Sequence, residues 1–411
     1  MRRFDLLQAY PMDATTFLPL ILEERVMEGP LEKAAELSRH ARRLLASTHG
    51  PVAHALVPLL RNMNSYYSNK IEGQHTTPSR IEQALRHDYS SDHDEYRKQR
   101  MAVAHIEAEA QLEAEWKDLP ASAMFDAGKV RRIHQLFFEA MPAEFRVTEQ
   151  GEPILPGQLR EKMVSVGRHA APPVDLLPRL MDDWARTYQR VKGFEHQLIA
   201  VACSHHGLAW IHPFIDGNGR VCRLHSHLTL HASGLTDGLW SPLRGFARTH
   251  DDYYLRLAAA DQQRRNDLDG RGNLSQEELV KFVDYFLDCC LDQVDFMLKM
   301  VEFDGLRARL MDLLSYLDRN PWTIGSEKSV IRPEKTALAL EMVALTRSLS
   351  RAEFSQIVGE SETTTRRILR SLLDFGVLTS ASHRDPVAFA LPLKSLRFLF
   401  PKLWPEVEGE E

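Results

Sequence analysis

The sequence predicts a mainly α-helical fold with one β-hairpin near its middle and a small helix-turn-helix unit at its C-terminal end. Three observations support this prediction: helical periodicity in almost every long segment, a non-helical stretch bounded by glycines at 151–173, and a helix–turn–helix–hairpin pattern after residue 304. We divide the chain into a helical N-terminal region (1–110), a central core (111–300) and a C-terminal unit (301–411).

The helices are predicted from apolar residues that recur every three or four positions, which places them on one helical face. One of these segments, 97–117, mixes Glu, Lys and Arg with Ala, as a long solvated helix does. The predicted helices before residue 301 are 30–47, 52–67, 79–87, 91–116, 126–141, 176–191, 195–210 and 274–300.

The hairpin is predicted inside 151–173, where Met163 and Ser165 alternate with valines between flanking glycines. Residues Pro172 and Pro173 end this stretch, and a helical pattern follows. An ordinary surface hairpin and a substrate-binding hairpin both fit the pattern alone.

The C-terminal unit shows helical patterns from 304, at 333–346, at 351–358 and at 361–375, with Ser361 as the expected N-cap. Two short strand patterns follow, so the order is that of a winged helix-turn-helix. The stretch 363–370 offers threonines and arginines that suit a DNA groove. Residues 331–400 hold ten Lys/Arg against seven Asp/Glu, a net charge of only +3. DNA contact and a protein-interaction or dimer module therefore both stay open.

Composition sets the broad class of the protein. The 411 residues are 44% apolar and 26% charged, which is typical of a globular protein of two or three domains. A net charge of −6 gives no reason to expect chain-wide binding to nucleic acid. We expect no signal peptide and no membrane span, and four cysteines without a Cys-x-x-Cys pair are expected to be free thiols in the cytoplasm.

One stretch, running from His212 to Arg223, combines the groups that one phosphate-transfer reaction needs. It reads His-Pro-Phe-Ile-Asp-Gly-Asn-Gly-Arg-Val-Cys-Arg. A helix that begins near Asn218 would offer unsatisfied backbone N–H groups to an anion. Arginine binds phosphate oxygens through two parallel hydrogen bonds, a carboxylate such as Asp216 suits Mg²⁺, and an imidazole is a base near neutral pH.

This stretch resembles the signature of the Fic family, His-x-Phe-x-(Asp/Glu)-Gly-Asn-Gly-Arg-x-x-Arg, at every fixed position. The resemblance implies a helical Fic core that transfers AMP from Mg·ATP to a hydroxyl side chain of a protein. It implies His212 as the base, Asp216 as the Mg²⁺ ligand and the Tyr253–Tyr254 pair as the wall of the adenine site. The residues expected to border the nucleotide are Glu72, Val166, Gly167, Arg168, His169, Asp216, Gly217, Asn218, Gly219, Arg220, Val221, Cys222, Arg223, Tyr253 and Tyr254.

The predicted hairpin is similar to the Fic flap, which pairs through its backbone with the protein segment to be modified. The expected partners are therefore ATP and a protein substrate, the protein itself included, and a homodimer is left open. Further along the chain, Ala258–Asp261 departs from the asparagine that the family often has there, which leaves one adenine contact open.

Ser68 and Glu72, followed by Gly73, are four residues apart, so both lie on one face of a helix. They resemble the inhibitory motif of Fic proteins, (Ser/Thr)-x-x-x-Glu-(Gly/Asn). The resemblance implies that Glu72 pairs with Arg223 and restrains transfer, and that Glu72 could also orient a water that removes AMP.

Two other functions stay open at this point. One is a Fic relative that transfers a different phosphate-containing group. The other is a DNA-binding regulator whose Fic domain senses nucleotide.

Overall fold

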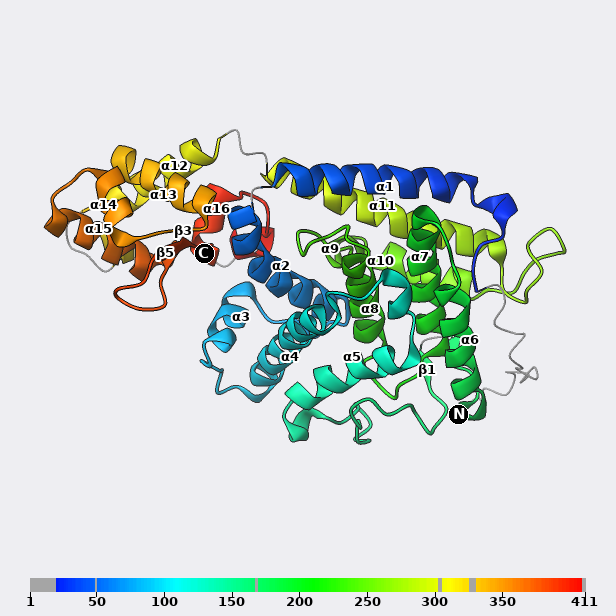
Figure 1. Ribbon diagram of the computed structural model, residues 1–411. Coiled ribbons are helices and arrows are strands. Elements are labelled where there is room, and N and C mark those ends of the chain that lie inside the picture. Colours follow the sequence, from blue (N-terminus) through cyan, green and yellow to red (C-terminus); the bar gives the residue numbers. More distant parts are fainter. Residues whose placement is uncertain (1–19, 49, 167–168, 302–304, 325–329, 409–411) are drawn as a thin grey trace.

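The computed structural model describes residues 20–48, 50–166, 169–301, 305–324 and 330–408, and these are mainly helical, as predicted (Figure 1). The helices are α1 Glu28–Ser47, α2 Gly50–Ile71, α3 Pro78–Leu85, α4 His93–Trp116, α5 Ala127–Ala140, α6 Leu177–Gln189, α7 Phe194–Ile211, α8 Asn218–Ala232, α9 Leu243–Arg248, α10 His250–Ala260, α11 Gln276–Val301, α12 Leu306–Arg319, α13 Pro333–Thr346, α14 Arg351–Val358, α15 Glu362–Phe375, α16 Leu396–Leu399 and α17 Pro405–Glu408. The strands are β1 Ser165–Val166, β2 His169–Ala170, β3 Ser348–Leu349, β4 Leu378–Thr379 and β5 Val387–Phe389.

Every helix predicted between residues 30 and 300 is present, and its ends lie within about one turn of the predicted ends. The structure also confirms that a helix begins at Asn218. The helix that carries Ser68 ends at Ile71, so Glu72 lies in the turn just beyond it.

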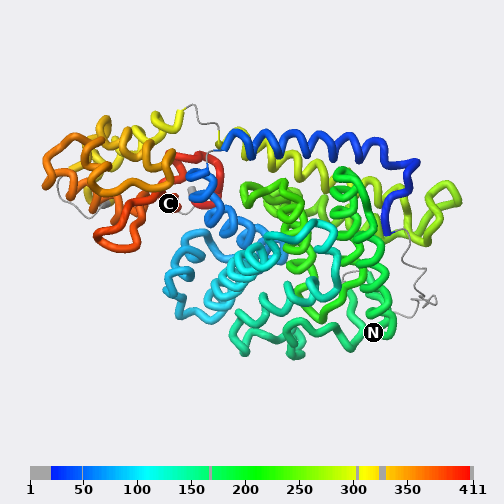
Figure 2. Tube along the Cα trace, in the orientation of Figure 1, coloured from blue at the N-terminus to red at the C-terminus, as the bar shows by residue number. Residues whose placement is uncertain are grey.

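The long helices α1 and α11 pack side by side along one edge of the molecule (Figures 1 and 2). The buried face of α1 carries Ala34, Leu37, Ala41 and Leu44, a spacing of three or four residues that makes one apolar stripe. Ion pairs across the seam, such as Lys33 with Asp288 at 2.8 Å, lie at its solvent-facing border. The N-terminal helix is thereby fixed to the last helix of the core.

The centre of the core is α8, which packs against α4, α5 and α7. Its buried positions extend around the helix, from Asn218 to Leu230, so α8 is enclosed on all sides rather than amphipathic. The N-terminal helix α2 packs against α4, α8 and α9. Helices α2 and α8, which are far apart in the sequence, therefore lie in contact.

The C-terminal unit contains α13, α14 and α15 and an antiparallel sheet in the order β3-β5-β4. Gly359 ends α14 with φ 64°, and the Ser361 side chain accepts the Thr364 N–H at 3.2 Å, as the predicted N-cap should. These are the elements that a winged helix-turn-helix requires, and the winged helix itself stays a prediction.

Two of the three exposed arginines of α15, Arg366 and Arg370, are paired with acids on the same helix. Arg366 lies 2.6 Å from Glu362, and Arg370 lies 3.7 Å from Asp374, both four residues apart in sequence. These pairs reduce the positive potential that a DNA groove would meet. Contact with DNA stays a prediction.

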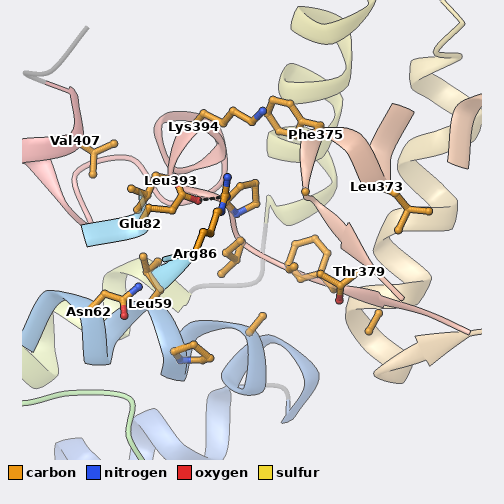
Figure 3. Close-up of a pocket in the computed structure, with 18 of the residues that line it drawn as sticks. Leu59, Asn62, Glu82, Arg86, Leu373, Phe375, Thr379, Leu393, Lys394 and Val407 are labelled. Carbon is orange, nitrogen blue, oxygen red and sulfur yellow. Dashed lines mark hydrogen bonds and ion pairs between the residues drawn. The ribbon is translucent and has the colours of Figure 1, made fainter. Parts of the chain in front are cut away.

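The last described segment folds back onto α2. Tyr67 and Lys70 of α2 each donate to the Glu406 carboxylate, both at 2.9 Å, and Trp404 packs edge-on against Tyr66. Beside this contact, a groove of about 950 Å³ separates α2 and α3 from the C-terminal unit. Figure 3 shows Glu82 of α3 and Arg86, just after α3, on one wall of the groove and Phe375 and Lys394 on the other.

None of the helices in the described ranges is both long and apolar enough to cross a membrane.

Candidate active site

The loop between α7 and α8 is held in one conformation by its own side chains. Asn218 accepts a hydrogen bond from the Phe214 N–H (2.9 Å) and donates one to the Phe214 carbonyl (2.8 Å). Gly217 has φ 77°, and a Cβ there would lie 2.7 Å from the ring of Phe138, so only glycine fits. His212 has φ 51°, an uncommon backbone conformation for a residue with a side chain.

A buried arginine outside the motif also holds this loop. The Arg160 guanidinium donates from Nε to the His212 carbonyl at 2.9 Å, and the Arg160 N–H donates to the Pro213 carbonyl at 2.9 Å. Because Arg160 is only 4% exposed, these bonds are shielded from water and fix the backbone of His212.

The imidazole of His212 is held in one tautomer by the backbone. Its Nδ1 atom lies 3.3 Å from the carbonyl oxygen of Ala209. A carbonyl oxygen only accepts, so Nδ1 carries the proton and Nε2 is the basic nitrogen. Burial lowers the pKa of His212 to about 4, so the ring is neutral near pH 7.

The N-terminus of α8 faces the carboxylate of Glu72. The first N–H groups of a helix have no intrahelical acceptor, and the helix dipole favours an anion there. A Cβ placed on Gly219 would collide with Oε1 of Glu72 and would lie 3.0 Å from a terminal nitrogen of Arg223. The Glu72 side chain therefore lies where the helix would receive an anion.

Arg223, which is 1% exposed, binds both residues of the Ser68–Glu72 pair. One terminal nitrogen donates to Glu72 Oε1 at 2.6 Å and to the Ser68 carbonyl at 3.0 Å, and Nε donates to the Ser68 hydroxyl at 3.2 Å. Burial alone would raise the pKa of Glu72, but the charges of Arg223 and Arg220 hold that pKa below its ordinary value. Glu72 is therefore ionised at neutral pH.

A cavity of about 180 Å³ opens between these groups. It brings together the predicted residues Glu72, His169, His212, Asn218, Gly219, Cys222, Arg223, Tyr253 and Tyr254. His212, the N-terminus of α8 and the buried guanidinium of Arg223 thus share one small space.

Other predicted residues lie outside this cavity. Arg220 does not line it: its guanidinium donates to the Gln74 side chain at 2.8 Å and lies over the ring of Phe137. Asp216 also lies beyond it, and its carboxylate is 3.7 Å from Arg220. Further predicted residues that do not line the cavity are Ser68, Gly217 and Val221.

The aromatic wall is built by α10. Tyr253 is buried, and its hydroxyl lies 2.8 Å from Nε2 of His205, while Tyr254 is 40% exposed. The two rings meet edge-on with centroids 5.4 Å apart. This pair offers an aromatic face to a flat ligand at the cavity mouth.

Asp261 lines the cavity at the position where the sequence departs from the family pattern. Its carboxylate lies 3.3 Å from Nδ1 of His169 and 2.9 Å from Nε2 of His206. The sequence contains a signal for this position, because residues 253, 257 and 261 are spaced by four and lie on one helical face.

The predicted hairpin is present as β1 and β2, which pair in antiparallel register, with Val166 opposite His169. His169 lines the cavity, and its Nε2 lies 2.8 Å from the Trp210 carbonyl. Gly167 and Arg168 lie outside the described residues.

Sequence reasoning missed three supporting residues: Arg160, Gln74 and Asp261. Arg160 binds the backbone of His212, and Gln74 binds the side chain of Arg220. Both lie far from the motif in the sequence. A signal was present only for Asp261.

Comparison with known proteins agrees with this geometry. Residues 124–230 match the Fic/DOC family. A protein adenylyltransferase Fic from Drosophila willistoni is 32% identical over 117 residues, 28% of this chain and 23% of that protein. Its counterpart from Drosophila grimshawi is 26% identical over 212 residues, 50% of this chain and 42% of that protein. The matched segment is thus less than half the length of either relative.

Solved structures show the same fold. A Fic family protein from Desulfovibrio desulfuricans G20 superposes with a TM-score of 0.51 and 19% identity, over 88% of this chain and 96% of that one. Fic-1 from C. elegans superposes with a TM-score of 0.50 and 14% identity, over 68% of this chain and 75% of that one. The chain therefore contains a Fic domain at residues 124–230, set in a mainly helical Fic-type fold.

Proposed function

We propose that this protein is a protein adenylyltransferase, which transfers AMP from ATP to a Ser, Thr or Tyr hydroxyl of a protein and is restrained by Glu72. The observation that carries the proposal is the convergence of His212, the N-terminus of α8 and Arg223 on one cavity beside Tyr253 and Tyr254. The relatives named protein adenylyltransferase Fic support the same activity.

The proposed reaction balances as a substitution at the α-phosphorus of ATP. The acceptor hydroxyl oxygen forms a bond to that phosphorus, the bond to the bridging oxygen of the β-phosphate breaks, and pyrophosphate leaves. The hydroxyl proton goes to Nε2 of His212, which is free because Nδ1 faces the Ala209 carbonyl. The N-terminus of α8 and Arg223 would stabilise the phosphate charges.

Asp216 is the residue that would hold Mg²⁺. Its side chain is 40% exposed, and it offers the hard carboxylate oxygen that Mg²⁺ prefers, together with phosphate oxygens and water. The ion supplies charge neutralisation of the phosphates when bound. The neighbouring Arg220, held by Gln74 and Phe137, would keep the Asp216 carboxylate oriented.

The restraint would act through competition for one guanidinium. Arg223 donates to Glu72 at 2.6 Å, and a terminal phosphate of ATP needs the same donors. ATP bound without that contact would lack the alignment that in-line attack requires, and misplacement of about 1 Å can cost roughly 100-fold in rate. The same carboxylate could orient a water for removal of AMP from the modified protein.

The acceptor protein would dock along the hairpin. Its strands are only two residues long, and Met163 just before β1 is 55% exposed. A short exposed strand can accept a backbone from another chain, which positions a segment while reading little of its sequence. A protein acceptor, the protein itself included, is therefore proposed rather than a small molecule.

The test is incubation with α-³²P-ATP or γ-³²P-ATP and Mg²⁺, using wild type, Glu72→Gly, and Glu72→Gly with His212→Ala. We expect protein label from the α-phosphate only, strongest in Glu72→Gly and absent when His212 is also replaced. Label from the γ-phosphate alone would refute AMP transfer in favour of a different phosphate transfer. No label in Glu72→Gly, with nucleotide still bound, would favour a nucleotide sensor. Chasing labelled protein with unlabelled ATP would measure removal of AMP.

A further inference from the structure

A buried cluster of three metal-ligating side chains lies outside the candidate active site, where α2, α4 and α8 meet. Glu109 and Glu113 are four residues apart on α4, and His227 faces them from α8. One ligand atom from each of the three lies within 4.8 Å of the others. Glu109 and His227 are each 1% exposed.

The distances in this cluster fit a shared metal ion better than a shared proton. Nε2 of His227 lies 3.4 Å from Glu109 Oε1 and 3.2 Å from Glu113 Oε1. Charge-assisted hydrogen bonds are usually about 2.7–2.9 Å long, and the single Nε2–H cannot align with two carboxylates. Ligands at about 2.1 Å from one ion lie roughly 3.0–3.4 Å apart, which is the observed spacing.

One oxygen of each carboxylate accepts a hydrogen bond from α2, and in Glu109 it is Oε1, the oxygen that faces His227. Asn64 of α2 donates to Glu109 Oε1 at 2.9 Å, and Arg61 of α2 donates to Glu113 Oε2. Such contacts orient ligating carboxylates in known metal sites. They also neutralise part of the charge that burial would otherwise make costly.

A second observation concerns buried polar atoms in and beside the cluster that have no hydrogen-bond partner among the described residues. Among the described residues, Glu109 Oε2 has no hydrogen-bond partner, and neither ring nitrogen of His105 has one. His105 is 0% exposed, and its Nδ1 lies 3.6 Å from that oxygen, too far for a hydrogen bond. Buried polar atoms without partners are rare in folded proteins, and an ion is one of their standard explanations.

We propose that Glu109, Glu113 and His227 bind one divalent transition-metal ion, with zinc as the best match. One imidazole and two carboxylates are ligands that zinc accepts, and a water would complete four-coordination. Solvent reaches the site beside Glu113, which is 10% exposed, and Arg61, which is 18% exposed. This ion is distinct from Mg²⁺ of the proposed reaction, because the cluster and the active-site cavity share no residue.

The site would join helices that the active site depends on. Asn64 precedes Ser68 by one turn of α2, and His227 follows Arg223 by one turn of α8. An ion between them would fix these two helices against each other without touching nucleotide. The expected role is therefore structural.

The test is metal binding by the full chain after treatment with a chelator. We expect one equivalent of Zn²⁺ by mass spectrometry and calorimetry, and a Co²⁺ derivative whose visible absorption indicates nitrogen and oxygen ligands. His227→Gln and Glu113→Gln should each weaken binding at least about 100-fold, and Asn64→Ala about 10-fold. The matched controls His250→Gln and Glu115→Gln, which change exposed residues of the same types, should bind as wild type does.

If the variants fail to fold, the wild-type protein alone still tests the proposed metal site. A site in the folded protein predicts that the melting temperature rises with Zn²⁺ concentration up to one equivalent. The proposal is overturned if wild type retains no ion and shows no such rise. It is also overturned if the controls lose binding while His227→Gln keeps it, since exposed histidines would then hold the ion.

Discussion

Oε1 of Glu72 lies 2.6 Å from a terminal nitrogen of Arg223, an arginine that is 1% exposed and lies at the N-terminal end of α8. Ser68 binds the same guanidinium through both its hydroxyl and its carbonyl. A buried cation is thus paired within the chain through Nε and one terminal nitrogen, and a phosphate that bound to that nitrogen would compete with Glu72.

Glu72→Gln removes the negative charge of Glu72 and keeps the size of its side chain, so it tests the effect of the charge alone. The amide keeps the volume above Gly219 and can still accept from Arg223, but it loses the charge, so a phosphate competes more easily. We expect the initial rate of α-³²P labelling to increase about 10-fold, and further in Glu72→Gly. The control Glu82→Gln changes a glutamate on α3 that pairs with Arg86. Equal rates in wild type and both Glu72 variants would show that Glu72 does not restrain the reaction.

Gly219→Ala should reveal the close contact between Gly219 and Glu72. The new Cβ would collide with the Glu72 carboxylate, which should lower the free energy of unfolding by about 1–3 kcal/mol. The cost should fall by at least about 1 kcal/mol in a Glu72→Ala background, because the colliding atoms are gone. Urea unfolding of the four proteins measures this coupling. Additive effects would contradict the contact.

Acid should weaken the loop that carries His212, through His134. Nδ1 of His134 accepts the Gly157 N–H at 2.8 Å, and the ring stacks on Phe214 with centroids 4.0 Å apart. Burial lowers the pKa of His134 to about 3, so the folded state keeps it neutral while the unfolded chain takes up a proton below about pH 6.5. The free energy of unfolding should therefore fall by about 2 kcal/mol from this residue between pH 7 and pH 5.

The variant that isolates this effect is His134→Gln, which keeps an acceptor for Gly157 but cannot be charged. Urea unfolding at pH 7 and pH 5 should show a loss of stability that is smaller in His134→Gln than in wild type. An identical loss in both proteins would assign the acid sensitivity to other groups.

Glu406→Gln should loosen the C-terminal segment from α2. Its carboxylate accepts from Tyr67 and Lys70, and their hydrogen bonds hold the pKa of Glu406 below its ordinary value although burial raises it. We expect a loss of about 1 kcal/mol in the free energy of unfolding. The control Glu360→Gln, whose partner Lys335 is exposed, should cost clearly less, because solvent screens an exposed ion pair. Equal losses in the two variants would contradict this account.

The sequence predicts the local parts of this protein well. Helical periodicity identifies the helices, and the glycines around Asn218 identify the start of α8, because both depend on neighbouring residues alone. The resemblance of Ser68 and Glu72 to the inhibitory motif predicts that Glu72 pairs with Arg223; the structure contains that pair and adds the bond from Arg223 to Ser68.

The contacts between distant segments could not be predicted in this way. Arg220 and Arg223 are three residues apart, yet only Arg223 lines the cavity, because Gln74 and Phe137 hold Arg220 elsewhere. The Asn218 side chain forms its hydrogen bonds with the backbone of Phe214. Such choices depend on which helices pack together, and periodicity gives no information about that.

The fold of the C-terminal segment onto α2 has a mechanical consequence. Tyr67 holds Glu406 and Ser68 holds Arg223, and these neighbouring positions point about 100° apart around the helix axis. Helix α17 and Arg223 are thus attached to the same turn of α2, on sides about 100° apart. A displacement of Glu406 would therefore act on the turn of α2 that holds Arg223.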